Sequence, residues 1–227
     1  KSSAASDVYK RQEYGYSERY ELINLPKNFD GNMYADRPND QTIKLHLNRE
    51  PRFYSWIGFA NGNYEISRYN AVDLAFNKAY VPGGLKMVAG GAHGWKTGQT
   101  THFSVTGYLN KKFTHPGLTT KLIQYPFPVF RLAELYLNYA EAKAELGTLT
   151  QTDIDNTVNK LRTRAGVTGK LNMNAANLAP DPYMCAPETG YVNVTGDNKG
   201  VILEIRRERA IAVSYTHLRA HETSLHL

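Results

Sequence analysis

Cysteine is nearly absent from this chain of 227 residues, which contains only Cys185. A single thiol excludes an internal disulfide framework and a metal site built from several cysteines. A catalytic role for Cys185 would require a base close to it, and the sequence offers no recognisable one. No segment approaches the ~20 consecutive apolar residues of a membrane-spanning helix. We therefore expect neither a cysteine-based site nor a transmembrane segment in these residues.

Dense basic clusters are also scarce, although the formal net charge is +6. The one concentrated group consists of Arg206, Arg207 and Arg209. It shares a predicted helix with Glu204 and Glu208. Interspersed carboxylates favour a solvated face of ion pairs over a surface that binds nucleic acid. We expect no nucleic-acid partner.

Phosphate-binding and catalytic motifs are missing as well. The glycine-rich run at residues 83–98 lacks the GK[ST] ending of a P-loop and the GxGxxG of a dinucleotide site, which favours a surface loop. Glu134 and Glu141 could act as paired acids, but on one helix they would lie about 10 Å apart along the axis. That separation is too long for a retaining glycosidase and marginal for an inverting one. We predict no enzyme, no cofactor and no metal site.

The two ends of the chain differ in character from the rest. Residues 1–12 and 214–227 resemble translated sequencing-adapter read-through, and the apolar helical pattern that ends at Ala212 does not continue. We predict that both segments are artefactual and exclude them from the fold prediction. Without them, 23 Lys and Arg residues face 19 Asp and Glu residues, a net charge of +4. His217 and His221 have the spacing of helical zinc ligands but lie in an excluded end.

The most informative segment is residues 125–166, which predicts two helices joined by a short turn. Prolines at its start favour an extended entry. Gly147 and Gly166 can adopt the left-handed conformation that ends a helix. Thr150 and Asp153 resemble a capping box at the start of the second helix. The length of the pair is typical of a tetratricopeptide-like hairpin.

The first of these helices is apolar on two sides. One stripe contains Leu132, Leu135, Tyr136, Tyr139 and Leu146, and the other contains Ala133, Leu137, Ala140 and Ala144. The second helix carries one apolar face, formed by Ile154, Val158, Leu161 and Ala165. A helix with two apolar sides packs on both of them. We expect Leu135 and Leu161 at the interface between the two helices, and Tyr136 and Tyr139 in the core.

The remaining elements complete a mainly α fold. Asn61-Gly62 between the β-prone residues 53–59 and 64–66 predicts a β-hairpin. Residues 101–113 are consistent with a strand, and residues 201–212 predict a last helix. Long irregular segments cover residues 82–100 and 167–200. The predicted fold therefore consists of tetratricopeptide-like helical hairpins with a small β-hairpin and long irregular loops.

Four sequence motifs together resemble the SusD/RagB family. In chain order they are REPRFYSWIGFANG (49–62), TGYLNKKF (106–113), RLAELYLNYAEA followed by LRTRAG (131–166), and ILEIRRERAIA (202–212). Glu50 stands where the family usually has Asp. Each motif alone is weak, but their order makes the match specific. Residues 13–213 are similar to part of the C-terminal half of the family's proteins.

The resemblance implies a nutrient-binding lipoprotein on the outer membrane of Bacteroidetes-type bacteria. Such proteins capture oligosaccharides, or peptides in some members, above a SusC-like TonB-dependent transporter. We expect the 227 residues to lack the N-terminal half and its lipid-bearing cysteine. Two alternatives stay open: a helical-repeat scaffold that binds a protein, and a glycan-active enzyme.

Aromatic residues outside the core stripes are the candidate ligand contacts. Trp95 lies in a polar, glycine-rich loop, and Tyr183 and Tyr191 lie in the irregular segment before the last helix. Trp56 alternates with Tyr54 in the predicted hairpin, so it could belong to the core or to a site. Aromatic faces with polar groups around them suit sugars. The residues do not identify which glycan or peptide would bind.

Overall fold

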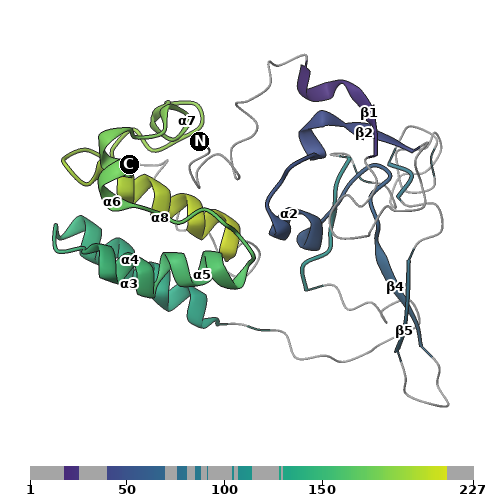
Figure 1. The fold of residues 1–227 in the computed structure, drawn as a ribbon, viewed down its shortest axis with the longest axis horizontal. Helices are drawn as coiled ribbons and strands as arrows, with labels where there is room; N and C mark the ends of the chain where they lie inside the picture. Colours follow the sequence, from purple (N-terminus) through teal and green to yellow (C-terminus); the bar gives the residue numbers. More distant parts are fainter. Residues whose placement is uncertain are drawn as a thin grey trace. The chain divides into compact units, whose positions relative to one another are not determined.

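The computed structural model describes residues 18–25, 40–69, 76–80, 85–87, 91, 104, 107–113, 128 and 130–213. The chain divides into two compact units, one with residues 1–7 and 128–227, the other with residues 8–127. Figure 1 shows helices in the first unit and short strands in the second. The ends predicted to be artefactual, residues 1–12 and 214–227, lie outside the described residues.

The helical unit contains the elements that make the fold mainly α, as predicted. They are α3 (Leu132–Glu145), α4 (Gln151–Asn156), α5 (Val158–Arg164), α6 (Met173–Leu178), α7 (Pro182–Cys185) and α8 (Lys199–Ala212). Helix α8 packs along α3, and α5 contacts both of them, while α6 packs on α8. The core therefore lies where α3, α5 and α8 meet.

Local signals in the sequence set the ends of the helical hairpin. Gly147 and Gly166 have φ angles of 70° and 73°, the left-handed conformation predicted for helix ends. Thr150 accepts a hydrogen bond from the Asp153 amide at 3.2 Å, and Asp153 Oδ2 accepts one from the Thr150 amide at 2.9 Å. This reciprocal pair confirms the predicted capping box. Lys143 binds the same carboxylate at 2.7 Å, and this contact and the Thr150 bonds hold the pKa of Asp153 well below its usual range.

The second predicted helix is divided in two by a break at Thr157. This residue has φ −122° and ψ −88°, outside the helical region. Its hydroxyl donates to the Asp153 carbonyl at 2.6 Å, the back-bonding that lets threonine compete with the helix backbone. Because neither glycine nor proline marks the position, the sequence pattern indicated one continuous helix.

The two apolar sides of α3 have different surroundings. Ala133, Leu137, Ala140 and Ala144 are buried, with exposed fractions of 2%, 0%, 0% and 1%. Leu132, Leu135, Tyr139 and Leu146 are 59%, 48%, 50% and 76% exposed. The prediction that Leu135 lies at the interface is therefore wrong, as is the core assignment of Tyr139. Leu161 is buried as predicted. The alanine-rich side of α3 is the side that packs on the other helices, because helix axes can approach more closely over small side chains.

This difference between the two sides of α3 predicts a clear contrast between two leucine substitutions. Leu137→Ala should lower the free energy of unfolding by about 2–5 kcal/mol, the range for a leucine removed from a packed core. Leu135→Ala should cost less than about 1 kcal/mol in this 227-residue chain, because half of the side chain is already in water. Urea denaturation followed by circular dichroism measures both values. Equal losses would show that both sides of α3 are packed.

The second unit contains three two-stranded antiparallel sheets in its described part. The pairs are β1 (Leu22–Asn24) with β2 (Gln41–Ile43), β3 (Ile57–Gly58) with β6 (Leu109–Asn110), and β4 (Glu65–Tyr69) with β5 (Phe76–Tyr80). Short helical turns η1 (Glu18–Tyr20) and η2 (Lys44–His46) and helix α2 (Pro51–Trp56) complete it. Of the predicted strand at 101–113, the structure shows strand conformation at Leu109–Asn110 within its described residues.

The hairpin predicted at Asn61-Gly62 is wrong in position. Residues 51–56 form a helix, with Pro51 at its first turn, and β3 pairs with β6 rather than with the strand that follows. A small hairpin-like pair is present instead between β4 and β5. The Asn61 amide donates to the Leu85 carbonyl at 2.7 Å, and the Leu85 amide donates to the Gly62 carbonyl at 2.9 Å. A segment distant in sequence therefore pairs with the backbone of Asn61 and Gly62.

A buried histidine lies in the aromatic core of this unit. Leu25, Tyr54 and Phe59 form the core, with Phe53 and Tyr108 packed against it. The His46 ring lies 4.6 Å from the Phe59 ring, measured between centroids. Its Nδ1 is 2.6 Å from Thr42 Oγ1 and its Nε2 is 3.0 Å from Tyr108 Oη. Burial, and then the charge of Arg49, lower the pKa of His46 to about 4.

This lowered pKa predicts a loss of stability in mild acid. The unfolded chain takes up a proton on His46 below pH 6.5, whereas the folded chain does so only near its pKa of about 4. The free energy of unfolding should therefore fall between these pH values, by up to about 3 kcal/mol from this residue. His46→Gln, which keeps a donor and an acceptor, should show a shallower decrease in urea titrations. Parallel decreases for both proteins would contradict the assignment.

Candidate functional site

Tyr183 and Tyr191, two of the predicted ligand contacts, lie in one compact loop of the helical unit. The Tyr191 amide donates to the Met184 carbonyl at 2.8 Å, and the Thr189 hydroxyl donates to the Tyr183 carbonyl at 2.6 Å. A Cβ atom on Gly190 would lie 2.0 Å from the Met184 oxygen, so only glycine permits this close approach. Both tyrosines are half-buried. The structure thus brings together two residues that the sequence placed only in a long irregular segment.

An ion pair from α8 holds the start of this tyrosine loop, residues 181–194. Asp181 Oδ1 accepts hydrogen bonds from the Tyr183 and Met184 amides at 2.7 and 3.3 Å, which caps α7. Its other oxygen, Oδ2, lies 2.8 Å from Nη2 of Arg207 on α8. One carboxylate therefore connects α8 to the backbone of Tyr183. Asp181 was not among the predicted site residues, although an Asp before Pro182 is a recognisable helix-cap signal.

The neighbouring arginine of α8 reaches Tyr191. The Arg206 guanidinium lies 5.0 Å from the centroid of the Tyr191 ring, within the range of a cation–π contact. The same guanidinium binds Glu141 and Glu145 of α3 at 2.9 and 3.0 Å. The charge next to the ring is thus held in place by two carboxylates. A ligand at this loop would meet an aromatic ring with an ordered polar group beside it.

The charges of α8 are arranged differently from the predicted solvated face. Arg207, Glu204 and Glu208 are 2%, 6% and 0% exposed, so this part of the helix is buried. Arg206 and Arg209 lie nearer the surface and pair with carboxylates of α3, not of their own helix. This part of α8 is buried because helices that are distant in sequence pack against both of its sides.

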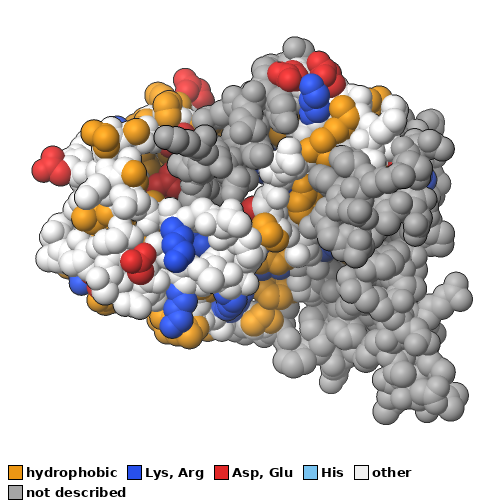
Figure 2. Space-filling model, viewed as in Figure 1, with side chains coloured by type: hydrophobic (Ala, Val, Ile, Leu, Met, Phe, Trp, Pro, Cys, Tyr) orange, Lys and Arg blue, Asp and Glu red, His pale blue; other side chains and the backbone are white. Residues whose placement is uncertain are grey.

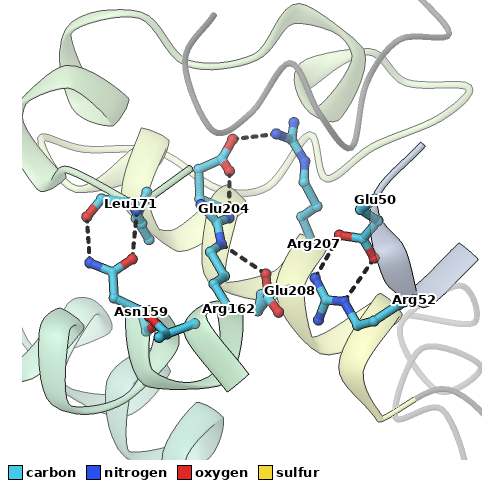
Figure 3. Close-up of polar contacts among 9 residues, drawn as sticks. Glu50, Arg52, Asn159, Arg162, Leu171, Glu204, Arg207 and Glu208 are labelled. Atoms are coloured by element: carbon cyan, nitrogen blue, oxygen red, sulfur yellow. Dashed lines mark hydrogen bonds and ion pairs between the residues drawn. The ribbon is translucent and has the colours of Figure 1, made fainter. Parts of the chain in front are cut away.

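The buried charges form a network centred on Arg162 of α5 (Figure 3). Arg162 Nε donates to Glu208 at 2.9 Å, and its Nη2 lies 3.4 Å from Glu204. Glu204 also accepts from Arg207 Nη1 at 2.5 Å. With Asp181, three carboxylates share two guanidinium groups. Burial raises the pKa of Glu204, and Asp181 adds to this effect, while Arg207 and Arg162 oppose it.

A second polar contact attaches the long segment after α5 to the helical hairpin. The Asn159 amide nitrogen donates to the Leu171 carbonyl at 3.0 Å, and its oxygen accepts from the Leu171 amide at 2.6 Å (Figure 3). Gln151 reaches the same Leu171 carbonyl and accepts from the Met173 amide at 2.9 Å. Asn159 and Gln151 thus bind backbone groups of Leu171 and Met173 that are not paired within a helix. In a sheet, a neighbouring strand would bind such groups.

Trp56, the third candidate, belongs to the other unit and ends α2. The ring is half-buried, and the Lys112 ammonium lies 4.1 Å from its centroid. Arg52, whose guanidinium lies 6.0 Å from the ring, is held by Glu50 through contacts of 2.8 and 2.7 Å (Figure 3). Cations thus lie close to this ring, so a sugar would compete with Lys112 for contact with it. The fourth candidate, Trp95, lies outside the described residues.

The contacts of Glu134 and Glu141 are those of polar residues on a packed helix rather than of a pair of catalytic acids. Glu134 is 4% exposed, and Glu141 binds both Arg206 and Arg209. These contacts are those of a packed helix face. The part of the chain that the structure describes contains no group of three His, Cys, Asp or Glu side chains suited to a metal ion. Within the same residues, every helix is too short or too polar to span a bilayer.

The burial of Arg162 predicts a large effect of its removal. Arg162→Met should lower the free energy of unfolding by about 3–5 kcal/mol, since it leaves the carboxylates of Glu208 and Glu204 without their central cation. Arg209→Met is the matched control, because Arg209 forms a partly exposed ion pair with Glu141 worth about 1 kcal/mol or less. Urea denaturation measures both. Similar small losses would show that Arg162 does not hold the network together.

Among solved structures, the chain is similar to a protein named BT4246 in its selenomethionine form. The alignment has 29% sequence identity and a TM-score of 0.59, and it covers 88% of this chain and 29% of that one. A second structure of BT4246 aligns with 27% identity and a TM-score of 0.49, over 88% of this chain and 28% of that one. The chain thus spans less than a third of the length of the protein it matches. No curated protein sequence matches it.

The family comparison covers nearly the whole chain. The model of the SusD family matches residues 5–215, a range that includes every described helix and strand and all four of the motifs named above. The resemblance predicted from those motifs is confirmed by this match and by the similarity to BT4246, a SusD-like protein from Bacteroides. The chain belongs to the SusD family.

Proposed function

We propose that this chain is part of a cell-surface protein that binds nutrients, chiefly oligosaccharides, for uptake through a SusC-like TonB-dependent outer-membrane transporter. The observation that carries the proposal is the family match over residues 5–215. The SusD family consists of binding proteins rather than enzymes. Peptides are the second nutrient class that the family relation allows.

The structure supports a binding role through the way its loops are held. The tyrosine loop is tied to α8 by Asp181 and Arg207, and Arg206 lies against the Tyr191 ring. A ligand loop that is already ordered loses little conformational entropy when it binds. Tyrosine rings bordered by charged groups suit sugars, which present an apolar face and hydroxyls at the rim. We assign ligand contacts to Tyr183 and Tyr191 on this basis.

The other candidates complete the proposed set of ligand contacts. Trp95 is proposed from its polar, glycine-rich sequence surroundings, in which no apolar periodicity assigns it to a core. Trp56 is proposed more narrowly, as a half-buried ring that contacts ligand while Lys112 stays on one face. In the complete protein, a lipid outside these residues would tether the protein to the outer membrane. Neither nucleic acid nor a metal is part of the proposal.

Calorimetry on the complete product of the gene that carries this sequence tests the function. Titration with a panel of glycans and peptides should give saturable binding to one class without conversion of the ligand, which chromatography of the mixture would check. Conversion of a glycan would indicate a glycan-active enzyme instead. Absence of binding to the whole panel would favour a helical scaffold that binds a protein.

Trp95→Ala should weaken binding of the glycan found in this way by about tenfold, which corresponds to 1.4 kcal/mol. The physical reason is the loss of a stacking face, and the melting temperature should stay unchanged because a loop aromatic contributes little to a core. Tyr20→Ala is the matched control, since Tyr20 is an aromatic residue with 51% exposure that is not assigned to the site. Unchanged affinity at unchanged stability would remove Trp95 from the site.

A further inference from the structure

The Arg206 guanidinium, which lies beside the Tyr191 ring, has hydrogen-bonding groups that the fold does not use. Its Nε donates to Glu141 at 2.9 Å and its Nη2 donates to Glu145 at 3.0 Å. The third nitrogen, Nη1, donates to none of the residues that the structure describes. Each terminal nitrogen of a guanidinium carries N–H groups that can only donate. Arg206 therefore presents a donor next to an aromatic ring.

Glu145 provides an acceptor next to that donor. It is the last residue of α3, and its side chain is 50% exposed. Its Oε1 accepts from Arg206, whereas Oε2 accepts no hydrogen bond from the described part of the chain. A carboxylate oxygen can only accept, so Oε2 suits a ligand group that donates. The ion pair holds the donor and the acceptor side by side.

The charges of this contact between α3 and α8 cancel. Two arginines of α8, Arg206 and Arg209, pair with two glutamates of α3, Glu141 and Glu145. A uronate or a sulfated sugar would bring a further negative charge to cations that are already paired. Its loss of hydration would therefore not be balanced by a new ion pair. An uncharged sugar does not meet this cost.

The tyrosine loop adds only negative charge. Among residues 181–194, the charged ones are Asp181, which is bound by Arg207, and Glu188, which is exposed. Figure 2 shows acidic and hydrophobic side chains where Figure 1 places α7, while the larger groups of basic side chains on the helical unit lie around α5. Like charges brought together at a binding surface disfavour the wrong partner. The loop is therefore suited to neutral ligands rather than anionic ones.

We propose that Tyr191, Arg206 and Glu145 form a subsite for an uncharged sugar residue with two adjacent free hydroxyl groups. The apolar face of the sugar lies against the accessible part of the half-buried Tyr191 ring. One hydroxyl accepts from Nη1 of Arg206, and the neighbouring hydroxyl donates to Oε2 of Glu145. The inference rests on the proposed function, to which it adds a class of sugar and two further contact residues.

The arrangement of Arg206 favours a binding role over a purely structural one. Both of its ion pairs form without ligand, so little side-chain freedom is lost when a sugar binds. Arg209, three residues further along α8, uses its guanidinium differently: it binds Glu141 and Asn138. Its partners include no aromatic ring among the described residues. The two arginines thus share a carboxylate but differ in their access to the tyrosine loop.

Calorimetry on the complete gene product tests the class of sugar. The neutral probes are maltohexaose, cellohexaose, xylohexaose and mannohexaose, and the anionic probe is hexagalacturonate. We expect saturable binding of at least one neutral probe, and binding of hexagalacturonate that is at least about tenfold weaker. Tightest binding of hexagalacturonate would overturn the inference and leave the proposed function intact. Binding of none of the five would overturn both the inference and the assignment of an oligosaccharide as the nutrient.

Variants measured with the neutral probe that binds most tightly test the contacts. Arg206→Met and Glu145→Ala should each weaken binding by about tenfold, because each removes one hydrogen bond to the sugar. Arg209→Met is the matched control, since it removes the same charge and also breaks a contact with Glu141. Its affinity should stay within about twofold of the unmodified protein. The melting temperatures of the two arginine variants should fall by similar small amounts, because both ion pairs are partly exposed.

Tyr191→Ala separates failure of this subsite from failure of the proposed function. Weaker binding in Tyr191→Ala, with full affinity in Arg206→Met and Glu145→Ala, would overturn the subsite and leave Tyr191 as a ligand contact. Full affinity in all three variants would remove Tyr191 from the proposed site as well. Equal losses of affinity in Arg206→Met and Arg209→Met would show an effect of charge or stability, which would also overturn the inference.

Discussion

The burial of the Arg162 guanidinium is the constraint on which the helical unit depends. A cation that is 1% exposed must have anionic partners, since an isolated buried charge is strongly unfavourable. Glu208 and Glu204 supply them from α8, more than 40 residues further along the chain. The crossing of α5 and α8 is thereby limited to arrangements in which these three side chains meet.

The same network extends to the surface that we propose for ligand binding. Glu204 also binds Arg207, and Arg207 binds Asp181, whose second oxygen caps the short helix that carries Tyr183. A chain of charge-assisted contacts thus runs from the centre of the unit to the tyrosine loop. Such contacts are stronger than neutral hydrogen bonds and more restrictive in geometry. The tyrosine loop is in this way given a defined conformation by the helices of the core.

Helix α3 shows why an apolar pattern is not sufficient to identify a buried face. Its two apolar stripes differ in side-chain size, and the described helices pack on the one made mainly of alanine. Close approach over alanine also lets Arg206 and Arg209 of α8 reach Glu141. The larger leucines and tyrosines remain on the outer side, beside the basic residues of α5. Of the two apolar stripes, the alanine-rich one is therefore the one that packs within the described helices.

Local chemistry in the sequence determined the helical class of the chain, the glycine ends at Gly147 and Gly166 and the capping box at Thr150, because each depends on neighbouring residues. The family was also readable, because its motifs are short and occur in order. Tertiary structure decided the rest. It selected which side of α3 is buried, broke the second helix at Thr157, and paired β3 with β6 in place of the local hairpin at Asn61-Gly62. It also brought Arg162, Asp181 and Arg207 into one network. These outcomes depend on contacts between residues far apart in the chain, and no local pattern encodes which distant partner will satisfy a buried charge or an unpaired backbone group.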